Sequence, residues 1–281
     1  MGDPFGKWHK ELWESDRDPK TKAKYWQVLT AYQSWLNGRG PDVPTAKEFI
    51  SYLREKGYAQ GTLLVYKHGL SPFFESMGQT LKIKLKKHHS LPEYHDRGDV
   101  ERLISEAEKG LYRHTRELKE RNTAIIVTLA YSGIRRGELV SLRVNDLEFH
   151  RRTIRVRQGK GNRDRVVPMH ERLVPHLRGQ CAGKGAREKV FSINGRKVHK
   201  MVTQLARRCG LDAFSPHSLR HYCATQLVEK GANLRAVQMI LGHQSLETTS
   251  VYIDVAPRHL QETIDLLDEP NVRAPDRRRF E

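Results

Sequence analysis

The sequence of 281 residues predicts a mainly helical protein that carries one small β-sheet. Along most of the chain, apolar residues recur at intervals of three and four, which is the spacing of a helix face. Only 153–157 and 165–167 alternate as short strands do, and the Gly159-Lys160-Gly161-Asn162 segment between them favours a hairpin turn. A lysine-rich stretch separates two groups of helical segments, which predicts two domains.

The first group, residues 1–78, is expected to form a small helical domain. Its predicted helices cover 19–37, 45–56 and 60–76. The first of them places five residues on one face: Tyr25, Val28, Leu29, Tyr32 and Leu36. Thr45 is the expected N-cap of the second, with Glu48 completing a capping box. All four tryptophans lie within the first 36 residues, and both core packing and DNA contact remain open for them.

Residues 79–97 are expected to link the two domains. Four lysines lie close together in this stretch: Lys82, Lys84, Lys86 and Lys87. Such a run of charge is typical of a solvated segment, but in a basic protein it also suits contact with the phosphates of DNA. The sequence leaves both interpretations open.

The second group, residues 98–256, is expected to form a larger domain around the hairpin. Its predicted helices cover about 99–108, 116–131, 171–178, 197–208, 216–230, 234–241 and 246–252. The helix over 116–131 is apolar on nearly every side between Ala124 and Ala130, which indicates a buried helix. A terminal segment, 257–281, should hold a C-terminal amphipathic helix over 258–268 and a basic tail.

The charge balance indicates the kind of partner. Lys and Arg number 50 against 33 Asp and Glu, so the net charge is +17 and favours nucleic acid or an anionic membrane surface. The most apolar stretch, Thr123–Tyr131, is far shorter than the ~20 residues of a spanning helix. Three unevenly spaced cysteines exclude a disulfide framework and a paired-cysteine metal site. These features predict a cytoplasmic protein that does not enter a membrane.

Five places hold polar residues that packing does not require. They are Arg135 and Glu138 within Ser132–Leu139, Lys160 at the hairpin tip, the group His217, Arg220 and His221, His243 after Leu241-Gly242, and Tyr252. Each has a plainer interpretation, such as a helix cap, a solvated turn or a packed tyrosine. Arg220 shares a helix face with the two histidines and would repel a metal ion. An anion at that helix N-terminus fits better, because unpaired amides and cations meet there.

Taken together, these side chains suit phosphoryl transfer without a metal. Arginine offers a fixed, two-pronged cation for the non-bridging oxygens of a phosphate. A tyrosine can form a covalent phosphodiester that keeps the bond energy for rejoining. A lysine can donate a proton to a departing alkoxide.

The order of these motifs resembles the tyrosine recombinase, or phage integrase, family, and its Xer-type members in particular. The matching elements are Ser132 to Leu139, Gly159-Lys160-Gly161, His217-Ser218-Leu219-Arg220-His221, Leu241-Gly242-His243 and Tyr252, nine residues after His243. The resemblance implies a helical core-binding domain over 1–78 and a catalytic domain over 98–256 that together form a C-shaped clamp on DNA. It implies no metal or nucleotide cofactor.

The resemblance also implies six catalytic residues: Arg135, Lys160, His217, Arg220, His243 and Tyr252. In this scheme the two arginines bind the scissile phosphate and His243 bonds a non-bridging oxygen. Tyr252 attacks the phosphorus, His217 exchanges a proton with it, and Lys160 protonates the leaving 5′-hydroxyl. Two further residues would support them: Glu138 and His221.

Partners follow from the same resemblance. The implied partner is double-stranded DNA with a specific site, bound by two protomers, and four protomers would exchange strands through a Holliday junction. The outcome would be integration or excision of a mobile element, or resolution of chromosome or plasmid dimers, with room for a second recombinase or an accessory protein. The helix over 258–268 is expected either to exchange between neighbours or to cover its own domain. The expected location is the nucleoid of the cytoplasm.

Two details of the sequence depart from a simple match, and two other functions stay open. Arg136 adjoins Arg135, so only the family pattern selects between them, and Tyr222 is a second tyrosine that should point off the His217 face.

A type IB topoisomerase-like nicking-closing enzyme would use the same chemistry without partner exchange. A DNA-binding regulator is also open, because the helices over 234–241 and 246–252 have helix-turn-helix spacing.

Overall fold

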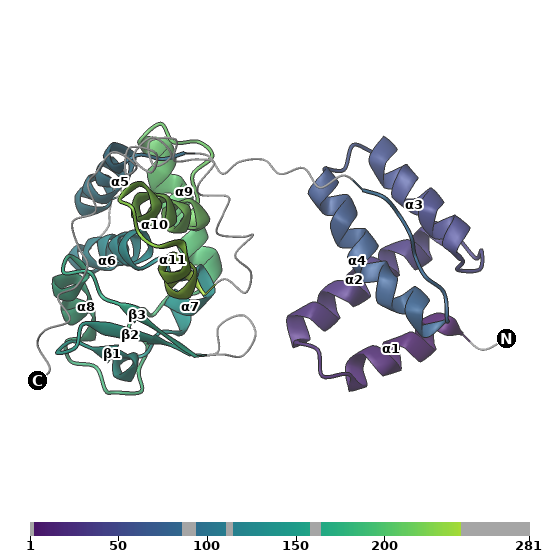
Figure 1. Cartoon of the computed structure of the whole chain (residues 1–281), viewed down its shortest axis with the longest axis horizontal. Coiled ribbons are helices and arrows are strands. Elements are labelled where there is room, and N and C mark those ends of the chain that lie inside the picture. Colours follow the sequence, from purple (N-terminus) through teal and green to yellow (C-terminus); the bar gives the residue numbers. More distant parts are fainter. Residues whose placement is uncertain (1–2, 86–93, 111–114, 158–163, 243–281) are drawn as a thin grey trace, which may run out of the picture. The chain divides into compact units, whose positions relative to one another are not determined.

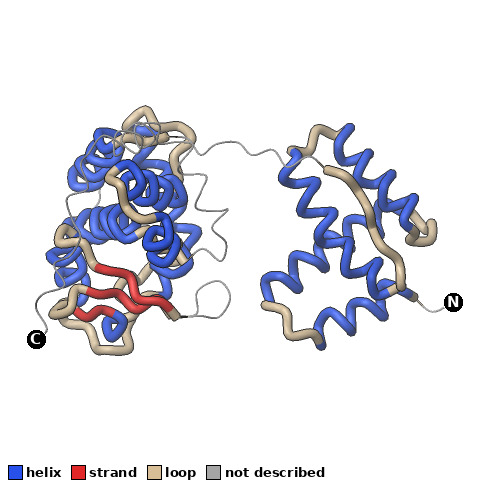
Figure 2. Tube along the Cα trace, viewed as in Figure 1, coloured by secondary structure: helices blue, strands red, loops and turns tan. Residues whose placement is uncertain are grey.

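The computed structural model describes residues 3–85, 94–110, 115–157 and 164–242. The chain forms two compact units, Met1–Ser90 and Leu91–Glu281. Helices dominate both units, and a three-stranded sheet lies at one edge of the second (Figures 1 and 2). The prediction of a mainly helical protein with one small sheet is confirmed.

The N-terminal unit consists of four helices around an aromatic core. They are α1 (Pro4–Glu14), α2 (Pro19–Leu36), α3 (Val43–Glu55) and α4 (Gln60–Ser76). Tyr32 is fully buried at the centre and lies near the rings of Phe5, Phe49 and Phe74. Among the tryptophans, Trp8 is buried in this core, whereas Trp13 is 47% exposed.

This unit differs from the expectations in two places. The predicted helices began at residue 19, and α1 is an additional helix that buries Phe5, Trp8 and Leu12. Thr45 was the expected N-cap of α3, but the helix begins two residues earlier and Asp42 caps it. The Asp42 carboxylate accepts a bond from the Thr45 amide at 2.7 Å, and the Thr45 hydroxyl accepts one from the Asp42 amide at 3.1 Å.

The second unit has seven α-helices among its described residues. They are α5 (Arg97–Lys109), α6 (Arg116–Ser132), α7 (Arg136–Ser141), α8 (Leu173–Cys181), α9 (Gly195–Arg208), α10 (Pro216–Glu229) and α11 (Leu234–Leu241). The sheet contains β1 (Leu147–Glu148), β2 (Thr153–Val156) and β3 (Arg165–Pro168), antiparallel in that order, after a 3-10 turn at Val144–Asp146. The β2–β3 hairpin was predicted, whereas β1 was not.

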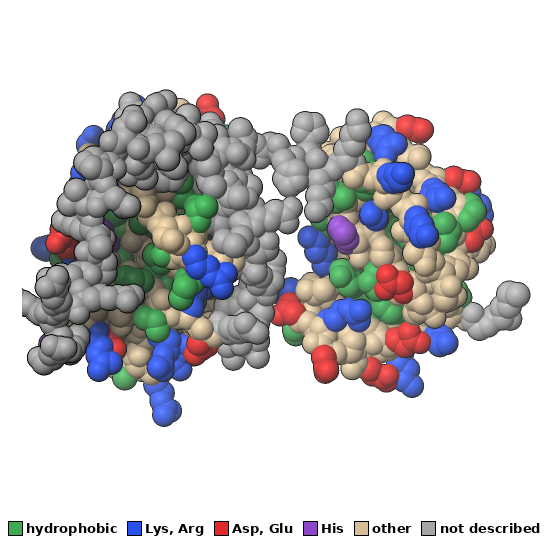
Figure 3. Space-filling model, viewed as in Figure 1, with side chains coloured by type: hydrophobic (Ala, Val, Ile, Leu, Met, Phe, Trp, Pro, Cys, Tyr) green, Lys and Arg blue, Asp and Glu red, His purple; other side chains and the backbone are tan. Residues whose placement is uncertain are grey.

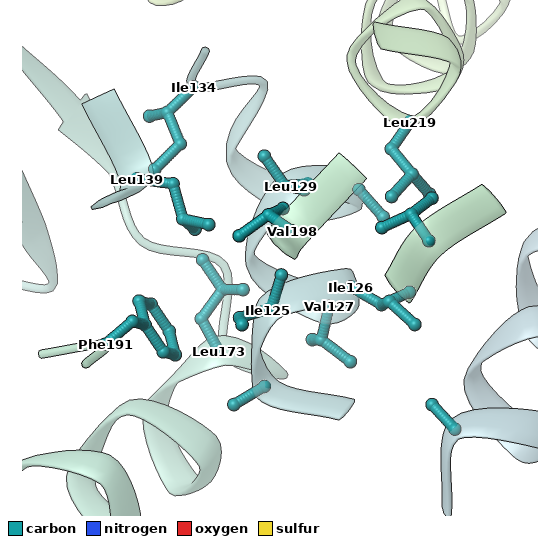
Figure 4. Close-up of a cluster of buried hydrophobic side chains, with 14 of the residues drawn as sticks. Ile125, Ile126, Val127, Leu129, Ile134, Leu139, Leu173, Phe191, Val198 and Leu219 are labelled. Atoms are coloured by element: carbon teal, nitrogen blue, oxygen red, sulfur yellow. The ribbon is translucent and has the colours of Figure 1, made fainter. Parts of the chain in front are cut away.

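Helix α6 forms the centre of the second unit. Its residues from Asn122 to Ala130 are all buried, and α5, α8 and α10 pack around it. Figure 4 shows Ile125, Ile126 and Leu129 facing other buried side chains, among them Leu219 of α10. This core fixes the end of α6 and the start of α10 against each other, which positions the site described below.

Gly133 ends α6 in a left-handed conformation, with φ of +61°. A Cβ atom at this position would lie 2.8 Å from Leu241 Cδ2. The glycine therefore serves two purposes, because it permits the turn and lets the end of α11 approach the end of α6.

Several predicted features lie outside the described residues. They are Lys86 and Lys87, the hairpin tip with Lys160, the helices over 246–252 and 258–268, His243, Tyr252 and the basic tail. Lys82 and Lys84 are described and exposed. None of the described helices combines the length and apolarity that crossing a membrane requires.

Candidate active site

A pocket of about 420 Å³ opens where the loop before α7, helix α9 and the start of α10 meet. Its lining residues are Ile134, Arg135, Arg136, Gly137, His199, Ser215, Pro216, His217 and Arg220. Three of the predicted catalytic residues, Arg135, His217 and Arg220, therefore come together although the sequence separates them by up to 85 positions. The described lining residues carry cations and imidazoles and include no carboxylate, which suits an anion.

The start of α10 faces this pocket. Ser215 caps the helix by accepting a bond from the His217 amide at 3.2 Å, and Pro216 occupies its first turn. The free amides and the helix dipole at such an end favour a negative charge.

Arg220 is the largest fully buried side chain of the chain's described part, with 1% of its surface exposed. Its guanidinium donates to the carbonyl of Gly133 at the end of α6, and to that of Leu241 at 2.7 Å. A buried cation is costly unless its hydrogen bonds are satisfied, and these carbonyls satisfy part of the set. They also hold the guanidinium at the pocket wall.

Arg135 approaches the pocket from the other side, as the residue that precedes α7. Its Nη1 donates to Glu138 Oε1 at 2.9 Å and its Nη2 to the Gly242 carbonyl at 2.8 Å. Glu138 also accepts a bond from the Arg135 amide at 2.7 Å, so it holds the residue by both backbone and side chain. The neighbouring Arg136 is exposed.

Arg165 is the residue that the sequence reasoning missed. Its Nη1 and Nη2 each lie 2.8 Å from an oxygen of Glu138, and its Nε donates to the Ile240 carbonyl at 3.0 Å. A signal was present in the strand pattern. Arg165 and the buried Val167 are two residues apart in β3 and so share the inner face, where an arginine needs a partner.

The two arginines keep Glu138 ionised. Burial alone would raise the pKa of this carboxyl, but the hydrogen bonds and charge of Arg165, with those of Arg135, outweigh it and lower the pKa to about 2. Glu138 is therefore a fixed anion that orients cations.

His217 lines the pocket, with its ring 4.2 Å from that of His221 between centroids. Burial lowers the pKa of His217, and the positive charges of Arg220 and Arg135 lower it further. Both effects favour the neutral imidazole, which can accept a proton. The residues described by the structure contain no group of three or more potential ligands that could hold a metal ion.

Tyr222 lies away from this pocket, as expected from its place on α10. It is 5% exposed and lines a separate pocket of about 250 Å³ with Tyr131 and Arg172. Burial raises the pKa of Tyr222, and the neighbouring Tyr131 raises it further. Both effects oppose the phenolate that a nucleophile needs.

We expect Tyr222→Phe to keep covalent adduct formation with DNA within about twofold of the unmodified protein, because the lost hydroxyl serves packing and a bond to Tyr131. The measurement is the yield of protein-linked DNA after denaturation. Loss of the adduct, with Tyr252→Phe still active, would instead make Tyr222 the nucleophile.

The remaining predicted catalytic residues, Lys160, His243 and Tyr252, lie outside the described residues. The last described residue, Gly242, directly precedes His243 in the sequence and has its carbonyl on Arg135.

Residues 94–259, more than half of the chain, match the family model described as the phage integrase family. The chain belongs to this family. The matched range contains every motif from Ser132 to Tyr252, so the predicted family is confirmed and the chain is a tyrosine recombinase.

Phage integrase relatives span nearly the whole chain. Tyrosine recombinase XerA of Thermococcus kodakarensis is 31% identical over 87% of this chain and 88% of its own length. Tyrosine recombinase XerD of Pseudomonas putida is 29% identical over 89% of this chain and 92% of its own length.

Solved structures show the same fold. The XerH site-specific recombinase bound to a palindromic difH substrate has a TM-score of 0.72 at 21% identity, over 88% of this chain and 80% of its own. The Tn1549 transposon integrase in complex with transposon right end DNA has a TM-score of 0.75 at 18% identity, over 93% of this chain and 98% of its own. The integrase fold thus agrees with the predicted fold class.

Proposed function

We propose that this protein is a site-specific recombinase that cuts and rejoins DNA through a 3′-phosphotyrosyl intermediate, without a metal ion. The observation that carries the proposal is the pocket in which Arg135, Arg220 and His217 converge at the N-terminal end of α10, with no carboxylate among its described lining residues. Fixed cations and free amides of this kind bind a phosphate and stabilise the charge that builds on it during transfer.

In the proposed cleavage step, the two arginines hold the non-bridging oxygens of the scissile phosphate and His243 bonds one of them. The Tyr252 oxygen forms a bond to phosphorus as the bond from phosphorus to the 5′-oxygen breaks. The tyrosine proton passes to neutral His217, and Lys160 gives a proton to the leaving 5′-hydroxyl. Glu138 and His221 support these groups. Attack by a 5′-hydroxyl from the partner duplex reverses the step and joins new strands.

We further propose that the protein clamps double-stranded DNA, with two protomers on each site and four in the complex that exchanges strands through a Holliday junction. The net charge of +17 supports this, as do the lysine and arginine side chains on the visible faces of both units (Figure 3). The exposed Lys82 and Lys84, together with Lys86 and Lys87, would contact DNA phosphates.

The biological outcome is integration or excision of a mobile element, or resolution of chromosome or plasmid dimers, at the nucleoid. A second recombinase or an accessory protein fits either outcome. The XerH and Tn1549 integrase structures are complexes with DNA, which supports a DNA partner here.

The test is to capture the covalent intermediate. The protein is incubated with sheared DNA from its source organism and denatured, and the protein-linked DNA is precipitated and sequenced, with Tyr252→Phe as the control. Adducts at one sequence that disappear in the control are the expected result. Dispersed, Tyr252-dependent adducts would replace the proposal with a topoisomerase-like enzyme, and DNA binding without any adduct would favour a regulator.

A further inference from the structure

Three arginines donate to three consecutive carbonyls at the end of α11. The pairs are Arg165 with Ile240 (3.0 Å), Arg220 with Leu241 (2.7 Å) and Arg135 with Gly242 (2.8 Å). The last carbonyls of a helix lack partners within the helix and carry partial negative charge, so guanidinium groups suit them. Two of these arginines also line the pocket, whereas Arg165 does not.

Arg165 contacts more of the site than its position outside the pocket suggests. Both of its terminal nitrogens bond Glu138, whose carboxylate in turn holds the backbone and side chain of Arg135. Only 12% of the Arg165 side chain is exposed. Its three hydrogen bonds to other segments are thus protected from water, which strengthens them.

Gly242 is shaped for this arginine. It has a φ of +65°, and a Cβ atom placed on it would lie 3.0 Å from Cδ, Nε and Nη1 of Arg165. The Arg165 side chain therefore packs closely against Gly242, where any side chain would collide with it. Gly242 directly precedes His243 in the sequence.

We infer that Arg165 is a positioning residue for DNA cleavage, which fixes Arg135 through Glu138 and seats the end of α11 that leads to His243. The inference rests on the proposed function, in which Arg135 holds the scissile phosphate. Arg165 touches no reacting atom in this scheme, so its substitution should weaken catalysis and leave DNA binding nearly intact.

The variant Arg165→Gln tests this with sheared source-organism DNA as the probe. We expect adduct formation to slow by about 10- to 100-fold, because small displacements of catalytic groups cost that much. DNA binding, measured on the same DNA by filter retention, should change by less than about threefold, since one charge among many is lost.

The pH profile separates positioning from mere folding. Two charged groups face Glu138: Arg135, from the loop before α7, and Arg165, from β3. Helix α9 packs on α7 and contributes the titratable His199 to the pocket. The end of α11 contributes backbone carbonyls. Without Arg165, burial should raise the pKa of Glu138, so its protonation would release Arg135 at a higher pH. Adduct formation by Arg165→Gln should therefore fall between pH 8 and pH 5 more steeply than in the unmodified protein.

Arg172→Gln is the matched control, because Arg172 also binds a carboxylate, Glu101, with both terminal nitrogens but lies in the other pocket. It should lose stability yet keep the rate and pH profile. If Arg165→Gln does not fold, the same measurements are made on Arg165→Lys. Lysine keeps the positive charge but cannot donate to both oxygens of Glu138 and to the Ile240 carbonyl at once.

The outcomes distinguish the two proposals. Unchanged rate and pH profile in folded Arg165 variants, with Tyr252-dependent adducts in the unmodified protein, would overturn the inference alone. Absence of Tyr252-dependent adducts in the unmodified protein would overturn the proposed function and the inference with it.

Discussion

Replacing Arg220 with alanine is expected to lower the rate of adduct formation by at least about 100-fold, because a fixed donor to the charge developing on the phosphate is lost. The same change should destabilise the second unit. It leaves the buried carbonyls of Gly133 and Leu241 without their donor, at a cost of about 1–3 kcal/mol each. The measurements are the single-turnover adduct rate and urea unfolding followed by circular dichroism.

Arg220→Lys is the control for charge alone. Lysine keeps the positive charge but cannot reach two carbonyls in different directions and a phosphate at once, so an intermediate rate is expected. All four tryptophans belong to the first unit, so tryptophan fluorescence reports the unfolding of that unit. Its urea midpoint should be the same in the Arg220 variants as in the unmodified protein. Cleavage by folded Arg220→Ala at nearly the unmodified rate would remove Arg220 from the proposed mechanism.

Glu138→Gln should change how stability depends on pH. The Glu138 carboxyl has a pKa of about 2 in the folded protein against an ordinary 4.5, so its ionisation stabilises the fold above pH 4.5. That contribution is lost as the pH falls toward 2, and about 2 kcal/mol should disappear between pH 6 and pH 3. The glutamine variant, which cannot ionise, should lose that much less stability over the same range.

Urea unfolding of both proteins at pH 6 and pH 3 measures this difference, since all other groups titrate alike in the two. Glu148→Gln provides the comparison, because Glu148 pairs with Arg151 at the surface and is 54% exposed. The change in stability of Glu148→Gln between pH 6 and pH 3 should equal that of the unmodified protein. If Glu138→Gln lost as much stability between pH 6 and pH 3 as the unmodified protein, the arginines would not hold Glu138 ionised.

The sequence predicted those helices best that have a long apolar face and clear end signals. The bounds of α4 and α11 agree with the expected 60–76 and 234–241. The start of α3 failed because Asp42 and Thr45 are both good caps, and a tertiary contact decides between them. The Thr45 hydroxyl lies 2.6 Å from the buried Tyr32 hydroxyl, which favours Thr45 within the helix.

Short elements failed for another reason. Strand β1 has two residues, too few to show any alternation. Helix α1 presents only three buried residues, whose burial depends on packing against the rest of the unit. Local pattern carries little information in both cases, and tertiary contacts supply the rest.

The site divides in the same way. Motif chemistry indicated Arg135, His217 and Arg220, and the structure brings these three into one pocket. The motifs did not indicate that backbone carbonyls would hold Arg135 and Arg220 in place, because every residue has a carbonyl. The bond from Arg135 to Gly242 spans 107 positions, beyond the reach of any local rule.

The use of carbonyls at the end of α11 also bears on how this protein can change over evolution. A carboxylate anchor such as Glu138 disappears with one substitution, whereas the carbonyls of Ile240 and Leu241 survive any side-chain replacement that leaves the helix intact. Residues there can drift while the guanidinium groups keep their acceptors. The exception is Gly242, where even one added methyl group meets Arg165. Mutational tolerance should therefore rise along α11 with distance from Gly242.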